Sequence, residues 1–316
     1  MEKRELGKTG ISVGTLMFGG NVFGRTADEA TSFKLLDTFT GAGLNFIDTA
    51  DVYSRWVPGN TGGDSELVIG KWFKKSGKRD KVILATKVGK EMGPGKKGLS
   101  PAYIKQAVED SLKRLQTDYI DLYQSHDDDR DTPLAETLEA YGQLIKEGKI
   151  RVIGASNYKA DRLAEALQVS ASNNLPAYQT LQPEYNMYQR QDYETNLEPL
   201  CLEQGLAVIP YYSLASGFLT GKYRSEADFS KSKRGQGIKK YLNDRGFRIL
   251  NALDQVAGQY HTSQASIALA WLMARPGILA PIASATSIEQ LNDLIKATEL
   301  KLSEEATTLL TEASSY

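Results

Sequence analysis

The sequence is poor in the side chains that form disulfides and metal sites, because its 316 residues include one cysteine, Cys201, and two histidines. A single cysteine cannot form an intrachain disulfide, and disulfides are rare in the cytosol, so we expect a cytoplasmic protein. With so few thiol and imidazole groups, a metal site built from cysteine or histidine is not expected. We therefore predict a protein without a bound metal.

An excess of charge of either sign is also missing, since 38 Lys and Arg residues stand against 39 Asp and Glu residues. Without a basic surplus we expect neither nucleic acid nor an anionic membrane as a partner. The first residues, "MEKRELGKTG", lack the apolar core of a signal peptide. No run approaches the roughly 18 apolar residues of a membrane helix. The pattern specifies no oligomeric state.

Eight short β-rich runs alternate with amphipathic helical patterns along nearly the whole chain. An alternation of this kind predicts a parallel sheet covered by helices, and eight units favour closure into a barrel. We therefore predict an α/β fold consisting of a single (β/α)8 TIM barrel domain over residues 1–316. The predicted strands are 13–18, 44–48, 81–87, 118–124, 150–156, 177–182, 206–213 and 278–283.

Local signals predict where helices and turns begin and end. Ser100 suits the N-cap and Pro101 the first position of a helix in "SPAYIKQAVEDSLKRL", and Gly148 suits the C-cap after "TPLAETLEAYGQLIKE". Ahead of the first strand, "RELGKTGISVG" predicts an N-terminal β-hairpin suited to plug the barrel floor. Strands seven and eight start about 70 residues apart, so a long loop is expected after strand 7.

A glycine motif, "GPGKKG" at residues 93–98, matches the dinucleotide fingerprint G-x-G-x-x-G. The preceding strand ends at Lys87, several residues too early for that fingerprint. The acid about 20 residues on, Asp118, begins the next strand, whereas the fingerprint needs an acid at a strand end. We therefore interpret this stretch as a flexible loop.

Polar side chains follow the apolar runs at the ends of most predicted strands. In a barrel of this kind, chemistry collects at the C-terminal ends of the strands. Capping of the next helix would explain Asp48, but it explains Lys87 poorly because a lysine opposes the positive end of a helix dipole. The strand-end residues are Asp48, Lys87, His126, Ser156, Asn157, Gln182, Tyr212, Ser213 and Ser284.

The stretch "NFIDTADVYS", residues 45–54, places Asp48 five residues before Tyr53. A tyrosine hydroxyl with a pKa near 10 is a poor acid at pH 7, but a nearby ammonium such as Lys87 lowers that pKa, and a carboxylate holds the ammonium in place. A histidine such as His126 can hydrogen-bond a carbonyl oxygen. These four groups are suited to protonate an alkoxide as hydride arrives, which calls for a nicotinamide cofactor.

Seven motifs, in this order and at barrel spacings, resemble the aldo-keto reductase family over essentially the full length. The resemblance implies that Asp48, Tyr53, Lys87 and His126 form a catalytic tetrad in which Tyr53 is the general acid. Two of the motifs are most similar to the branch that includes voltage-gated potassium channel β-subunits and bacterial reductases. The motifs are "GLNFIDTADVY", "LATKVG", "DLYQSHDDD", "EGKIRVIGASNY", "LQPEYN", "YYSLASGFLTGKY" and "ATSIEQL".

The same resemblance implies a cofactor site and, in the loops, a substrate pocket. Ser156, Asn157 and Gln182 are expected to hold the nicotinamide carboxamide, and Tyr212 to stack on its ring. The pyrophosphate is expected at Ser213, Leu214, Gly217, Leu219 and Lys222, and the adenosine near Ser284, Thr286, Gln290 and Asp293. Candidates to line the substrate pocket are Phe23, Trp56 and Tyr188, for which ordinary packing is an equal alternative.

The sequence departs from the family at the adenosine end, where "IASATSIEQLND" has no basic residue and Leu294 replaces a frequent asparagine. We still expect NADP(H) to be preferred to NAD(H), because hydroxyls at a predicted helix N-terminus favour a phosphate. The resemblance implies that an arginine of the seventh loop reaches the 2′-phosphate, with Arg234 the nearest match and Lys233 the second. The alternative is a solvated loop face and equal use of NAD(H).

Two functions from different classes fit these motifs. The first is an NAD(P)H-dependent oxidoreductase that reduces a small-molecule aldehyde or ketone to an alcohol. The second is a cofactor-binding regulatory or partner subunit, as in the channel β-subunit relatives, which carry a similar tetrad. We favour the enzyme, because we expect no N-terminal arm ahead of the hairpin that would act on a partner.

Overall fold

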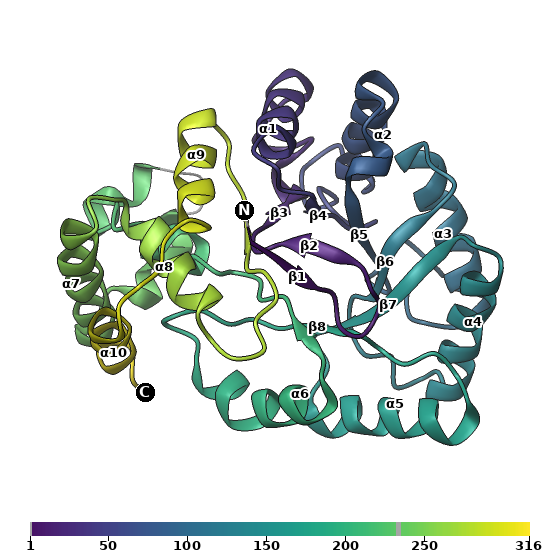
Figure 1. Cartoon of the computed structure of the whole chain (residues 1–316). Coiled ribbons are helices and arrows are strands. Elements are labelled where there is room, and N and C mark those ends of the chain that lie inside the picture. Colours follow the sequence, from purple (N-terminus) through teal and green to yellow (C-terminus); the bar gives the residue numbers. More distant parts are fainter. Residues whose placement is uncertain (1, 232–234) are drawn as a thin grey trace.

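The computed structural model describes residues 2–231 and 235–316, and it has an eight-stranded parallel sheet at its centre (Figure 1). The strand order β10-β3-β4-β5-β6-β7-β8-β9 follows the chain once around, as the alternating sequence pattern predicts. The strands are β3 (Met17–Gly19), β4 (Phe46–Asp48), β5 (Ile83–Val88), β6 (Ile120–Ser125), β7 (Ile150–Ser156), β8 (Thr180–Gln182), β9 (Ala207–Val208) and β10 (Ile282–Ala283).

The sheet closes on itself between β9 and the segment that leads into β10. Val208 forms a parallel bridge with Ile278, and the amide of Leu279 donates to the Val208 carbonyl at 2.8 Å. On the other side, β10 pairs in parallel with β3 through Ile282 and Met17. The chain therefore has the (β/α)8 barrel fold that its eight alternating units predict.

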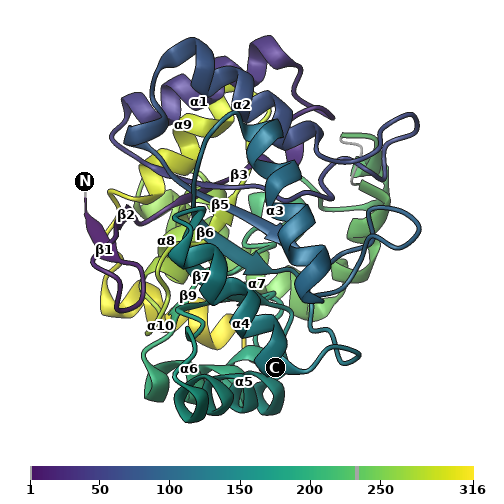
Figure 2. The same cartoon turned by 90° about the vertical axis from the view of Figure 1, so that its right-hand side faces the viewer.

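Helices cover the outside of the barrel, and Figure 2 shows α3 and α4 over β5, β6 and β7. Ser100 caps α3 by accepting a hydrogen bond from the Tyr103 amide, as predicted. Gly148 lies one residue beyond the C-cap of α4, with φ of 72°, where a residue without Cβ is favoured. The helices are α1 (Glu29–Gly41), α2 (Asp64–Ser76), α3 (Pro101–Leu115), α4 (Leu134–Lys146), α5 (Ala160–Asn173), α6 (Glu198–Gln204), α7 (Asp244–Gln259), α8 (Gln264–Met273), α9 (Ile288–Ala297) and α10 (Glu304–Ala313).

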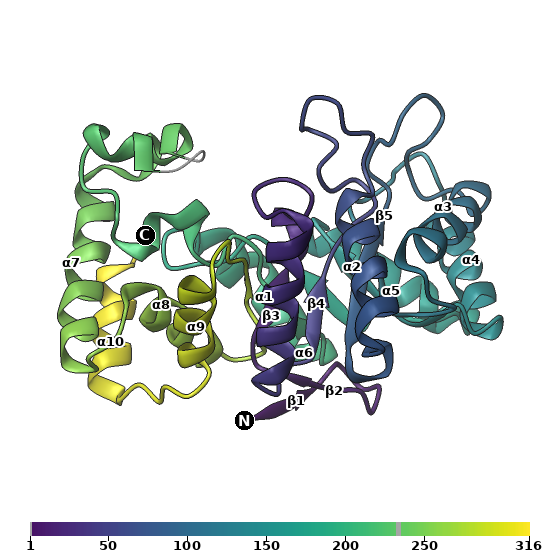
Figure 3. The ribbon, with the colours of Figure 1, turned by 90° about the horizontal axis from the view of Figure 1, so that it is seen from above.

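An antiparallel hairpin, β1 (Lys3–Glu5) and β2 (Ser12–Gly14), precedes the barrel. Its apolar side chains Leu6, Ile11 and Val13 belong to one buried cluster with inward-facing strand residues such as Met17 and Phe46. The hairpin therefore plugs the barrel floor, as predicted. Figure 3 shows it at one end of the barrel, with the loops that follow β4 and β5 at the other end.

The predicted first strand, residues 13–18, is wrong as a single element. Its first part, up to Gly14, is the second strand of the hairpin, and its last part, from Met17, is the first barrel strand. Between them the Gly14 amide donates to the Asn45 side chain at 2.9 Å, as the chain passes from the floor into the barrel wall. A hydrophobic run alone does not show this change of direction.

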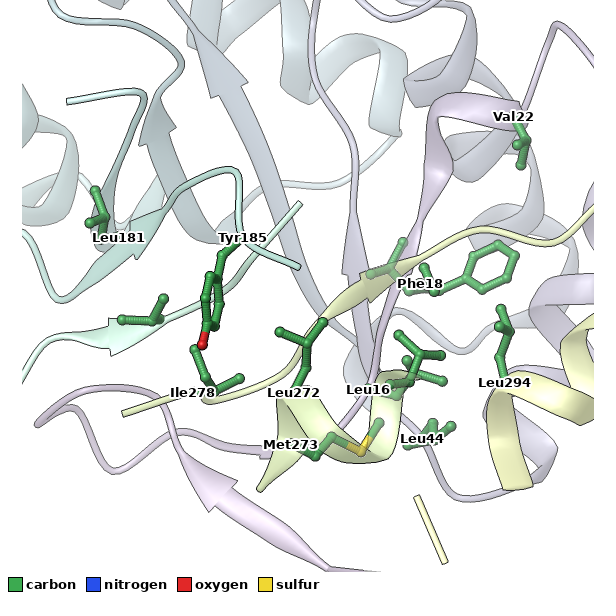
Figure 4. Packing of buried hydrophobic residues seen from close by; sticks show 14 of the residues in the cluster. Leu16, Phe18, Val22, Leu44, Leu181, Tyr185, Leu272, Met273, Ile278 and Leu294 are labelled. Atoms are coloured by element: carbon green, nitrogen blue, oxygen red, sulfur yellow. The ribbon is translucent and has the colours of Figure 1, made fainter. Parts of the chain in front are cut away.

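A second and larger hydrophobic cluster fills the space between the barrel and its helices. Figure 4 shows part of it, in which Leu16 and Phe18 of the first strand region lie near Leu294 of α9. Strand residues thus alternate between this layer and the interior cluster, because successive side chains point to opposite faces. The two layers hold the strand ends in fixed positions, on which the site depends.

The long segment between β9 and α7 contains three 3₁₀ helices, η4 (Ala215–Thr220), η5 (Glu226–Lys231) and η6 (Gly235–Tyr241). The predicted long loop after strand 7 is thus present, with short helical turns along it. Lys233 and Arg234, the candidates for the 2′-phosphate, lie outside the described residues. Among the helices of the described ranges, none combines the length and the apolar composition that a membrane crossing requires.

Candidate active site

A buried ion pair joins two neighbouring barrel strands at their C-terminal ends. Asp48 ends β4 and Lys87 lies near the end of β5, and the Lys87 Nζ lies 2.7 Å from a carboxylate oxygen of Asp48. The two side chains are 2% and 0% exposed. The ammonium also donates a hydrogen bond to the Thr49 carbonyl at 2.8 Å. These two contacts use two of its three N–H groups.

Tyr53 lies in the loop after β4, and its hydroxyl completes this arrangement. Lys87 Nζ donates to Tyr53 Oη at 2.9 Å, and Tyr53 Oη donates to Asp48 Oδ2 at 3.1 Å. The ring of Tyr53 is partly exposed, while its hydroxyl lies at the buried end against the ion pair. The phenol therefore has a cation and an anion within hydrogen-bond distance.

The protonation of Tyr53 differs from the prediction. Burial and the adjacent carboxylate of Asp48 raise the pKa of Tyr53 well above its usual value of about 10, although we expected Lys87 to lower it. Burial also lowers the pKa of Lys87, and the Asp48 charge opposes that change. Tyr53 is therefore a protonated phenol at neutral pH, which can give up a proton but is poorly suited to accept one.

His126 follows β6, and its ring lies 6.1 Å from that of Tyr53, in an edge-on orientation. Its backbone amide donates to the Val88 carbonyl at 2.8 Å, which ties it to β5. Burial and the charges of Lys87 and Lys90 hold the pKa of His126 well below its usual value, so the imidazole is neutral. Its Nδ1 is buried and has no hydrogen-bond partner among the described residues.

The residues expected to hold a nicotinamide carboxamide lie at the ends of β7 and β8. Gln182 Nε2 donates to Asp48 Oδ1 at 3.1 Å, and Ser156 Oγ donates to the Gln182 carbonyl at 2.9 Å. Asn157 donates to the His126 carbonyl at 2.8 Å and accepts from Tyr211 at 2.7 Å. The three side chains are therefore tied to one another and to the tetrad, around the same end of the barrel.

An exposed aromatic ring and a tight turn lie beside this group. Tyr212, at φ of 52°, is 49% exposed, so its ring offers a free face at the barrel mouth. Ala215, Ser216 and Gly217 follow in the left-handed region, which turns the backbone sharply, and Gly217 has φ of 98°. The amides of Ala215 and Gly217 donate within the turn, to the carbonyls of Tyr212 and Leu214 at 2.6 and 2.8 Å. The turn leaves space beside a glycine without Cβ, and together with the exposed ring it suits a planar group followed by an anion.

The other residues expected at the pyrophosphate surround this turn. Ser213 is buried and donates to the Pro210 carbonyl at 3.0 Å. The Leu214 carbonyl accepts from the amides of Gly217 and Leu219 at 2.8 and 3.3 Å. Lys222 is exposed, and its ammonium lies near Gly217.

The residues expected near the adenosine lie at the start of α9. Ser287 caps that helix, and Gln290 Oε1 accepts from the Thr286 amide at 2.9 Å. Ser284 donates to Asn21 at 2.8 Å, which ties the end of β10 to the loop after β3. Asp293 points toward solvent and lies 3.6 Å from Lys296, its only salt-bridge partner among the described residues.

The three candidates for the substrate pocket have different surroundings. Phe23 is completely buried and stacked on Phe18 at 5.4 Å, so its ring packs in the core and does not line an open pocket. Tyr188 packs edge-on against Tyr241 at 4.8 Å and is partly exposed. Trp56 is 50% exposed, with its ring 5.9 Å from that of Tyr53. Trp56 thus lies at the mouth of the site.

A second buried acid, Asp51, lies two residues before Tyr53 and was not predicted from the sequence. Asp51 is 2% exposed, and neither carboxylate oxygen has a hydrogen-bond partner among the described residues. Burial and the charge of Glu66 raise the pKa of Asp51 to about 8, while Arg114 opposes that shift. Glu66 itself pairs with Arg114 at 2.7 Å. An acid inside "DTADVY" is a signal for this feature, but its burial depends on packing.

A closed parallel barrel, with a buried carboxylate and ammonium at its strand ends and a phenol bonded to both, defines a (β/α)8 protein with a polar cluster at the mouth of the barrel. The chain belongs to the aldo/keto reductase family, whose model matches residues 10–315. Membership agrees with the resemblance carried by the seven motifs.

Individual relatives match along nearly the whole chain. An uncharacterised oxidoreductase, YrpG of Bacillus subtilis strain 168, is 37% identical over 98% of this chain and 95% of its own length. A probable voltage-gated potassium channel β-subunit of Arabidopsis thaliana is 32% identical over 95% of this chain and 92% of its own length. A norsolorinic acid reductase of Aspergillus flavus is 33% identical over 93% of this chain and 75% of its own length. The family and these relatives support a general oxidoreductase function.

Proposed function

We propose that the protein is an NADP(H)-dependent carbonyl reductase, in which Tyr53 protonates the oxygen of an aldehyde or ketone. The observation that carries the proposal is the contact of one phenol with both a buried ammonium and a buried carboxylate, at 2.9 and 3.1 Å. A relative named as a reductase of norsolorinic acid supports the reductive direction. The raised pKa of Tyr53 keeps the phenol protonated at neutral pH but makes it a weaker acid, so the proposed transfer depends on Lys87 to stabilise the phenolate that forms.

Each member of the tetrad has a separate task in this proposal. Tyr53 donates its proton to the developing alkoxide, and the Lys87 ammonium, 2.9 Å away, stabilises the phenolate that remains. Asp48 holds that ammonium in place at 2.7 Å. His126, neutral and close to Tyr53, is the group that orients the carbonyl oxygen by a hydrogen bond. A bound nicotinamide cofactor supplies the hydride.

The cofactor would lie over Tyr212, with its carboxamide at Asn157 and Gln182 and its pyrophosphate at the turn around Gly217. Since a carboxamide would compete with protein groups for Gln182, we expect the contact between Gln182 and Asp48 to be exchanged when the cofactor binds.

The preference for NADP(H) rests on the N-terminus of α9, where Ser287 and backbone N–H groups favour a phosphate. The charge would come from the seventh loop, where Lys231 already pairs with Asp228 at 2.7 Å. Arg234 therefore remains the proposed partner of the 2′-phosphate, and a cytoplasmic location remains a prediction.

A partner subunit with little catalysis is the second candidate, and one relative named as a probable potassium channel β-subunit favours it. The two functions differ in turnover. Consumption of NADPH with a panel of aldehydes, ketones and quinones supports the reductase, and cofactor binding without turnover across that panel supports the partner subunit.

The test of the proton donor uses Tyr53→Phe with Tyr119→Phe as the matched control. Both changes remove one phenol hydroxyl, but Tyr119 lies under Arg79, away from the tetrad. We expect Tyr53→Phe to lower kcat by about 10²–10⁴-fold, as for other positioned acids, and to leave cofactor affinity nearly unchanged. The control is expected to keep wild-type turnover. A Tyr53→Phe variant with more than about a tenth of wild-type kcat contradicts the assignment.

A further inference from the structure

Two loops at the mouth of the site bring a tryptophan and an arginine together. Ser54, in the loop after β4, donates to the Phe23 carbonyl at 3.1 Å, so the loop after β3 is fixed against it. The guanidinium of Arg25 lies over the Trp56 ring, 5.7 Å from its centre. Because Trp56 also contacts Tyr53 at 5.9 Å, a group held by this pair lies next to the proposed proton donor.

Arg25 differs from the other cations nearby because it has no counterion among the residues that the structure describes. Arg55 lies 3.6 Å from Glu91, and Lys90 lies 2.6 Å from Asp127. In the described part of the chain, no carboxylate lies within salt-bridge distance of Arg25, and its guanidinium makes no hydrogen bond. Arg25 is also partly buried, and a partly buried charge without a partner is costly unless something binds it.

The chemistry of the pair specifies what it would bind. A guanidinium offers a planar fork of donors that matches a carboxylate, and it is always charged. The half-exposed face of Trp56 offers a flat apolar surface to a planar skeleton. Resting on the proposed carbonyl reduction, we propose that Arg25 and Trp56 select carbonyl substrates that carry a carboxylate on a planar, conjugated or aryl skeleton.

A competing explanation is that Arg25 has a purely structural role. The Cβ and backbone of Asp64 pack closely against the position of Gly24, which precedes Arg25, so this loop is fixed by packing as well. A structural role predicts that loss of Arg25 affects charged and neutral substrates equally, because the site itself would be disturbed. Recognition of a carboxylate predicts a change in the ratio between them.

The experiment compares 4-formylbenzoate with its methyl ester, as substrates of the intact protein with NADPH. The two molecules share the ring and the aldehyde, and differ in the charge. The measured quantity is kcat/KM for the anion divided by kcat/KM for the ester. We expect Arg25→Gln to lower this ratio by about tenfold at low salt. Arg25→Lys is expected to keep the ratio within about threefold of wild type, since the charge remains. Arg55→Gln, the matched control, is expected to keep it within about twofold, because Arg55 is already paired.

Ionic strength gives a second measurement that a structural role would not change. Raising salt from about 0.02 M to about 0.3 M should lower the wild-type ratio, and should have little effect on the ratio in Arg25→Gln. If wild type reduces the ester and Arg25→Gln has the same anion-to-ester ratio of kcat/KM as wild type, this inference is overturned and the proposed function is not. A rise in KM for NADPH in that variant also overturns it, because Arg25 would then bind the cofactor. A wild type that oxidises NADPH with other carbonyls of the panel but reduces neither of these aldehydes also overturns this inference alone. Absence of turnover across the whole panel overturns the proposed function, and this inference with it.

Discussion

The buried carboxyl of Asp51 allows a prediction that does not depend on the reaction. Asp51 has a pKa of about 8 in the folded protein, against about 3.9 in an unfolded chain. Between these two values the folded state keeps a proton that the unfolded state has lost. Unfolding at pH 6 should therefore release one proton from Asp51, and Asp51→Asn should release one proton fewer than wild type.

The magnitude follows from linkage between proton binding and folding. The folded pKa of Asp51 is raised, so the stability from its proton is fully present below about pH 3.9 and is lost as pH rises towards 8. One proton corresponds to about 1.4 kcal/mol per pH unit, so the loss over this range of about four pH units is about 6 kcal/mol. Asp51→Asn lacks this proton. The free energy of unfolding of the variant should therefore rise relative to that of wild type by about 1.4 kcal/mol for each unit by which pH increases in that window.

The assay is potentiometric titration of proton release on guanidinium unfolding at pH 6, in weakly buffered solution. It counts protons directly, and so it holds even where unfolding has intermediates. Asp80→Asn is the matched control, because the Asp80 side chain is 66% exposed, and it should release as many protons as wild type. Equal release by Asp51→Asn and wild type would refute the reasoning, because Asp51 would then be ionised in the folded protein.

Three further predictions concern the tetrad, the loop and the cofactor. Lys87→Met leaves Asp48 buried without its cation, so it should cost about 3–5 kcal/mol of stability and move the limb of the pH–rate profile that reports Tyr53 to higher pH. An unmoved limb in a folded variant would show that Lys87 does not act on Tyr53. Trypsin should cut at the Lys and Arg residues of 223–240 readily without cofactor and slowly with NADPH, measured by mass spectrometry, and equal cutting would argue against closure of the loop over the cofactor. Arg234→Ala should weaken NADPH by roughly 10–100-fold in kcat/KM and leave NADH nearly unchanged, and a parallel loss of both would rule out a contact with the 2′-phosphate.

Much of the fold and the tetrad could be predicted from the sequence because both depend on local patterns. The alternation of apolar runs and helical periods indicates the parallel barrel, and a polar residue after most of the runs marks the end where β4 and β5 place Asp48 and Lys87. Hydrogen bonds among Asp48, Lys87 and Tyr53 follow from that placement. The cap at Ser100 is likewise a property of adjacent residues.

Features that depend on packing could not be predicted in this way. The pKa of Tyr53 rises because of burial and a carboxylate contact, and neither is visible in the spacing of residues. Phe23 and Trp56 are both large aromatics in loops, yet one is completely buried and the other is 50% exposed. The division of residues 13–18 between hairpin and barrel depends on the contact of Gly14 with Asn45, about 30 positions away.

The pairing of β3 with β10 has a consequence for synthesis of the protein on the ribosome. Asp48, Tyr53, Lys87 and His126 are all translated within the first half of the chain, but β3 lacks one neighbour until Ile282 and Ala283 emerge. A nascent chain therefore carries all four of these side chains on a sheet with an open edge, and such edges promote aggregation. Ser284 and the start of α9 emerge later still. A ligand that binds at the start of α9 could therefore stabilise the barrel only after translation is nearly complete.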